Sequence, residues 1–158
     1  MTTAAGEFMR RWEFVHMMTR DFVSGVPDAH WEFSPHARFA PFCKQLRHVI
    51  CVRGLYNETL ERGHADWSRK HEQYTGGLTR ASLDQALQAK HEAMLATLRR
   101  LEKAGGDRLV EFVGKSMHLG EFAQVIVHHE ALHQGQWSLY ATLAGFQTPP
   151  SWRLNWGL

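Results

Sequence analysis

The sequence lacks several features that would mark a specialised class of protein. No apolar run approaches the length of a membrane span, and the first residues contain no basic segment followed by an apolar core. The net charge of +2 comes from 18 basic and 16 acidic residues that are well mixed, so no basic face for nucleic acid is indicated. We therefore expect a cytoplasmic protein that binds neither membranes nor nucleic acid.

Cysteine is also scarce. Cys43 and Cys51 fall within one predicted helix, where the intervening residues rise about 12 Å, which exceeds the reach of a disulfide. We expect two reduced thiols in the core. The length of 158 residues suits a single domain, residues 1–158, built around one core.

Apolar residues recur at steps of three and four in four segments, which predicts four amphipathic helices over residues 5–25, 41–62, 79–104 and 120–144. Thr79 or Ser82 is the expected N-cap of the third helix. Residues 26–40 suit a connecting loop with room for a short helical turn, and residues 109–119 suit a hairpin or an extended lead-in. The fold class is therefore all-α, a four-helix bundle. The long loop 63–77 between helices two and three allows a topology other than simple up-and-down.

Histidine is unusually frequent, with 11 residues. His129 and His133 are four residues apart, so on a helix both side chains lie on one face, one turn apart. His48 lies inside the apolar arc of the second helix and is the natural third ligand. A single buried histidine is usually a packed core residue, but two on one inward seam favour a shared divalent ion.

Three neutral imidazole nitrogens suit zinc, nickel, copper or iron(II), and three protein ligands leave positions open for water or substrate. His91 also falls on a core seam. It could be a fourth ligand or support the ligands from behind, although a packed core histidine is the favoured interpretation. Tyr56, Trp137 and Tyr140 could line the mouth of the site, but aromatic residues at helical spacing are more often plain core.

Residues 129–133 also match the H-E-x-x-H motif of metalloproteases, in which the glutamate is the general base. Such enzymes need a further downstream ligand. No Asp or Glu follows Glu130, and position 139 is Leu139, so neither known form of the motif can be completed. A hydrolase is therefore disfavoured. Glu130 could orient a ligand or lie on a flanking surface, and the surface is the favoured interpretation.

The segment from His129 to Gln136, followed by Leu-Ala-Gly and Pro-Pro, resembles the last helix of the DinB/YfiT-like superfamily, whose pattern is close to H-E-x-x-H-R-G-Q. The segment around His48 is similar to the family's second helix. This resemblance implies that His48, His129 and His133 bind one divalent metal ion, zinc first and nickel as the main alternative, in a protein that forms homodimers. Gln134 departs from the family's arginine, which puts an anion contact there in doubt.

Family members with known chemistry are thiol-dependent transferases and isomerases. The resemblance therefore implies a metal-dependent enzyme of thiol-transferase type that acts on a small molecule, with a low-molecular-weight thiol as cosubstrate. No catalytic side chain beyond the metal ligands can be named. The alternative is a non-catalytic, stress-related protein that binds a metal or a small ligand. The open coordination argues mildly against it, because structural zinc sites usually have four protein ligands.

Overall fold

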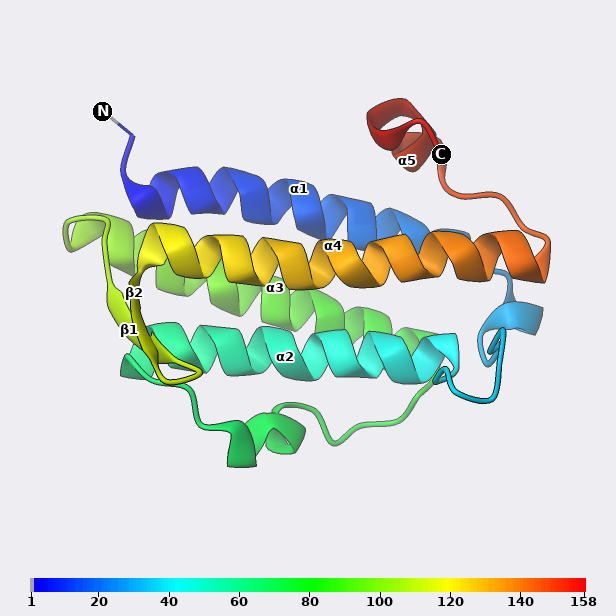
Figure 1. The fold of residues 1–158 in the computed structure, drawn as a ribbon, viewed down its shortest axis with the longest axis horizontal. Coiled ribbons are helices and arrows are strands. Elements are labelled where there is room, and N and C mark those ends of the chain that lie inside the picture. The colour runs from blue at the N-terminus through cyan, green and yellow to red at the C-terminus, as the bar shows by residue number, and fades with distance from the viewer. Residues whose placement is uncertain (1) are drawn as a thin grey trace.

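The computed structural model describes residues 2–158 and confirms the all-α expectation. Four long helices form a bundle (Figure 1): α1 (Ala4–Gly25), α2 (Phe42–Arg62), α3 (Arg80–Lys103) and α4 (Leu119–Ala144). Their bounds lie within a few residues of the predicted ranges. No helix among residues 2–158 is both long enough and apolar enough to cross a membrane.

The helices do not alternate in direction along the chain. In Figure 1, α1 and α4 run one way while α2 and α3 run the other, so the bundle has up-down-down-up topology. α1 packs against α3 and α4, and α2 packs against the same two helices. The parallel pair α2 and α3 needs a connection that returns along the bundle. The predicted long loop serves this purpose and carries a 3-10 helix, η2 (Trp67–Gln73), which packs on α2.

Local signals in the sequence set the ends of the helices. The hydroxyl of Thr3 accepts a hydrogen bond from the backbone N–H of Gly6 at 3.0 Å, and Thr79 caps α3 in the same way. Gly63 and Gly145 end α2 and α4 in the left-handed conformation, with φ of 83° and 81°. The ends of the long helices were therefore predictable from the residues at the caps.

The shorter elements partly follow the expectations. A 3-10 turn, η1 (Asp28–His30), lies in the first loop, and the segment before α4 is an antiparallel hairpin of β1 (Leu109–Phe112) and β2 (Lys115–His118). The sequence did not predict α5 (Pro150–Trp156). Pro149 and Pro150, which follow the end of α4 by several residues, are the N-cap and the first residue of α5, because proline is favoured in the first turn of a helix.

A polar layer divides the core into two apolar clusters. One cluster surrounds Trp137 and Phe22 near α5, and the other surrounds Trp12 and Phe122 near the hairpin. Between them each long helix contributes polar side chains at mid-length, which are His16, Thr19, His48, Arg53, Gln88, His91, His129, Glu130, His133 and Gln134. The candidate site is part of this layer.

Two further expectations concern single side chains. Cys43 and Cys51 are free and buried, as predicted, and burial raises the pKa of both thiols. Leu143, by contrast, is 65% exposed although the three-four seam of the last helix predicts it in the core. A seam with a strict seven-residue repeat drifts by about 20° per heptad on a straight helix, so the end of a long seam turns away from the core.

Candidate metal centre

The three predicted histidines come together between α2 and α4. His48 projects from α2, and His129 and His133 project from successive turns of α4. The Nε2 atom of His129 lies 3.2 Å from that of His48 and 3.3 Å from that of His133. One ring nitrogen from each residue falls within a group whose members all lie within 4.8 Å of one another. All three side chains are half-buried, so the site retains access to solvent.

Three nitrogens facing one another do not satisfy each other by hydrogen bonding. A neutral imidazole offers one N–H donor and one lone pair. The lone pair of His129 Nε2 therefore accepts one good hydrogen bond, whereas two other Nε2 atoms lie within reach of it. A cation placed among the three nitrogens would use all three lone pairs at once. The donor set thus fits a metal ion better than it fits a closed hydrogen-bond network.

The two separations measured from His129 match those around a tetrahedral ion. Two nitrogens bound to one zinc ion at the usual bond length lie about 3.3–3.4 Å apart. The observed separations of 3.2 and 3.3 Å from His129 Nε2 are close to that value. The residues present therefore fit the group that the sequence predicts.

The electrostatic surroundings keep the histidines neutral, as metal ligands must be. Burial, together with the positive charge of Lys70, lowers the pKa of His48 to about 4. Burial and the neighbouring His133 lower the pKa of His129 to about 4, and burial is also the main cause of the lowered pKa of His133. The lone pairs are therefore available at neutral pH.

Lys70 is a residue of the site that sequence analysis missed. It lies in η2, the segment that packs on α2, and its charge contributes to the lowered pKa of all three histidines. Among residues 2–158 no carboxylate forms an ion pair with it, and its side chain is half-buried. The histidines therefore lie in the field of a positive charge that no ion pair within residues 2–158 neutralises.

Tyr56, Trp137 and Tyr140 are buried in the core, which the sequence analysis favoured over a place at the mouth of the site. Tyr56 packs edge-on against the ring of His129, with centroids 5.8 Å apart, and Trp137 lies 6.4 Å from His133. Both are buried, and so is Tyr140, whose hydroxyl donates to the carbonyl of Ala40 at 2.7 Å. The rings of Tyr56 and Trp137 limit the movement of His129 and His133.

His91 lies outside the cluster and is a packed core histidine. Its ring stacks on that of His16 with centroids 3.7 Å apart, and the ring of Trp12 stacks with it at a centroid distance of 6.2 Å. The Nε2–H of His16 donates to Gln88 Oε1 at 3.1 Å, which leaves His16 Nδ1 to accept from Arg53 at 3.0 Å. The two histidines belong to the polar layer on the α1–α3 side of the bundle.

The favoured interpretation of Glu130 as a surface residue was wrong. Glu130 is 2% exposed, and its carboxylate forms an ion pair with Arg53 of α2, which sequence analysis did not single out. The helix places Glu130 about 100° away from His129, and that direction leads into the bundle rather than to solvent. Because its carboxylate is bound by Arg53, Glu130 is also not placed to act as the general base of a protease.

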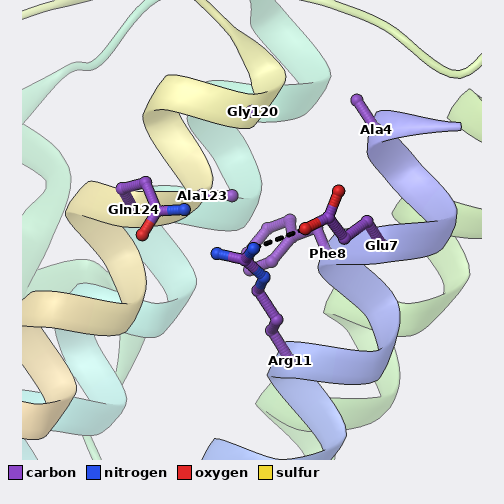
Figure 2. Close-up of a pocket in the computed structure, with 7 residues that line it drawn as sticks. All are labelled: Ala4, Glu7, Phe8, Arg11, Gly120, Ala123 and Gln124. Atoms are coloured by element: carbon purple, nitrogen blue, oxygen red, sulfur yellow. Dashed lines mark hydrogen bonds and ion pairs between the residues drawn. The ribbon is translucent and has the colours of Figure 1, made fainter.

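A small pocket lies elsewhere on the molecule, between the first turns of α1 and α4 (Figure 2), with a volume of about 190 Å³. An ion pair within α1, between Glu7 and Arg11, faces Gly120 and Ala123 of α4 across it. None of the three histidines lines this pocket, and its only charged groups already neutralise each other. The histidine cluster therefore remains the better candidate site.

Comparisons with known proteins agree with the fold. A model described as the DinB superfamily matches residues 11–137. The crystal structure of a DinB-like protein from Bacillus subtilis, YjoA, superimposes with a TM-score of 0.70 at 17% sequence identity, over 91% of this chain and 95% of that chain. No curated protein matches the sequence. The matched range includes all three clustered histidines and the buried Arg53–Glu130 pair.

Proposed function

The chain belongs to the DinB superfamily, and from this membership and its converging histidines we propose that His48, His129 and His133 bind one divalent metal ion. The observation that carries the proposal is the convergence of three neutral imidazoles, in which the Nε2 atom of His129 lies 3.2 and 3.3 Å from those of His48 and His133. Imidazole ligands favour zinc or nickel over magnesium and calcium, which prefer oxygen. We propose zinc first, with nickel as the main alternative.

The reaction we propose is a thiol transfer to a small electrophilic molecule, with a low-molecular-weight thiol as cosubstrate. A divalent ion with an open position supplies Lewis acidity that lowers the pKa of a bound thiol. The chain itself would contribute the positive charge of Lys70, whose field reaches the histidines and favours an anionic thiolate and anionic groups on the cosubstrate. The flanking aromatic rings would shield one side of the site from water.

A metal-content experiment tests the binding site. We expect chelator-treated protein to take up about one zinc ion per chain, and the His48→Ala variant to take up almost none. His128→Ala is the control, because His128 is an exposed histidine of α4 next to His129 and lies outside the cluster. It should bind zinc like the wild type. Full stoichiometry in His48→Ala, measured by elemental analysis after gel filtration, would contradict the three-histidine site.

The thiol reaction needs a separate assay. Zinc-loaded and metal-free protein are incubated with glutathione, bacillithiol or mycothiol and a panel of alkyl and aryl electrophiles. Formation of the new sulfur–carbon bond releases the leaving group and the thiol proton, so loss of free thiol measures turnover. We expect consumption only with the metal-loaded wild type. Equal rates with the metal-free protein, or with His48→Ala, would refute a metal-dependent transferase.

We also propose a homodimer, formed through the outer face of α4. Leu132, Leu139 and Leu143 are each more than 60% exposed and follow one another at helical spacing along that face. Light scattering coupled to gel filtration should show a dimer for the wild type and a monomer for Leu139→Glu. A monomeric wild type at tens of micromolar would contradict the proposal. The cytoplasmic location and the single-domain organisation stay predictions.

A further inference from the structure

Behind the histidine cluster lies a fully buried ion pair between α2 and α4. The side chains of Arg53 and Glu130 are each 2% exposed. Arg53 Nε donates to Glu130 Oε2 at 2.9 Å, and Arg53 Nη2 donates to Glu130 Oε1. The contact is therefore two-pronged, and such a contact fixes orientation as well as distance.

The remaining polar atoms of the pair connect it to α1. Arg53 Nη1 donates to His16 Nδ1 at 3.0 Å, and Thr19 donates its hydroxyl proton to Glu130 Oε1. Gln134 in turn donates to Thr19 Oγ1 at 2.8 Å. The guanidinium also lies over the ring of Trp12, 4.5 Å from its centroid. Both charged groups are thus held from several directions, and Gln134 serves this network rather than the metal site.

The position of the pair along the two helices connects it with the candidate ligands. Glu130 is the residue directly after His129 and lies within the turn that separates His129 from His133. Arg53 follows His48 on α2 by little more than one helical turn. A shift of α2 along α4 would break the two-pronged contact and would also separate His48 from the two histidines of α4.

Stability alone does not explain such a pair. The desolvation cost of two buried charges roughly cancels their attraction, and a well-packed apolar pair of similar volume is often as stable or more so. An apolar contact, however, tolerates sliding, whereas two directional hydrogen bonds do not. We propose that Arg53 and Glu130 are positioning residues that set the register of α2 against α4, so that the three Nε2 atoms converge before the metal arrives. This inference rests on the proposed metal site.

The test measures zinc affinity, by competition with a chromophoric chelator, in Glu130→Gln and Arg53→Met. We expect both variants to bind zinc at least tenfold more weakly than the wild type, because misplaced supporting groups typically cost ten- to a hundredfold in affinity. Arg53→Met is decisive. A purely electrostatic effect would leave cation binding unchanged or tighter once a positive charge is removed, whereas the loss of register weakens it.

A control separates positioning from general loss of stability. Leu98→Ala removes a buried side chain of α3 and leaves the ion pair intact. It should lower the melting temperature of the metal-free protein, yet bind zinc within about twofold of the wild type. The visible spectrum of bound cobalt(II) adds a second readout, since its bands report the coordination geometry. It should change in Glu130→Gln and Arg53→Met but not in Leu98→Ala.

The outcomes are distinguishable from those of the proposed function. A wild type that binds no zinc overturns the metal site and this inference together. Wild-type affinity and an unchanged cobalt spectrum in Arg53→Met overturn the inference alone. If Arg53→Met does not fold, the Arg53→Lys variant replaces it. Lysine keeps the charge but not the planar two-pronged contact, and wild-type affinity in Arg53→Lys likewise overturns the inference.

Discussion

Lowering the pH from 7 to 4 should destabilise the protein through His16. This side chain is only 6% exposed and lies between the guanidinium of Arg53 and the stacked ring of His91, with Gln88 at its other nitrogen. Burial first, and then the charge of Arg53, lower the pKa of His16 from 6.5 to about 3. The folded protein therefore keeps His16 neutral over a range in which the unfolded chain binds a proton.

The sign and the size of the effect follow from this difference. The contribution of His16 to stability is complete above the unfolded pKa of 6.5 and is lost as the pH falls toward the folded value of about 3. Each pH unit within that window costs about 1.4 kcal/mol. Between the unfolded pKa and pH 4, the loss from His16 amounts to about 3 kcal/mol, which is a large part of the stability of a typical domain.

The assay compares wild type and His16→Gln by urea unfolding at pH 7, 6, 5 and 4, with a chelator present. The glutamine amide can accept from Arg53 and donate to Gln88 as the histidine does, but it does not titrate. All other acid-sensitive groups are common to the two proteins, so the difference between their free energies of unfolding isolates His16. Between pH 7 and pH 4, the free energy of unfolding of the wild type should fall by about 3 kcal/mol more than that of His16→Gln. Parallel curves would refute the reasoning.

Two further predictions concern the core. Trp152→Ala should lower the free energy of unfolding by about 3–5 kcal/mol, because Trp152 is fully buried and donates to the carbonyl of Met18 at 2.8 Å. The control Trp156→Ala removes a partly exposed ring and should cost much less. Equal losses of the two variants in chemical denaturation would contradict the account of α5. Cys43 and Cys51 should react with a thiol reagent only on unfolding, since both are buried with a raised thiol pKa. Rapid labelling of the native protein would contradict that burial.

The helices and the histidine cluster were predictable because their signals are local. Caps and glycines mark the ends of the helices, and the spacing of His129 and His133 places them on one face whatever the partner helix. The apolar arc around His48 then selects the third member. The direction of each helix was less accessible, because the composition of residues 63–77 indicates a loop but not the path that the loop takes.

The ion pair was missed although its signal is present in the sequence. Arg53 follows Val49 by four residues and precedes Tyr56 by three, which places it on the buried stripe of α2. Glu130 follows Ile126 by four on a second inward stripe of α4. A basic and an acidic residue on two buried stripes must find partners. Which charges pair still depends on how the helices pack, and that is tertiary information.

The distance along the chain between the candidate ligands has a kinetic consequence for a metal-bound protein. His48 and His129 are separated by 81 residues, and the segment between them includes the η2 crossover, all of α3 and the hairpin. An ion held by both would close this long loop as a cross-link that a chelator can remove. Such a link would act after the helices have docked, and would therefore slow the opening of the bundle more than it would speed its assembly.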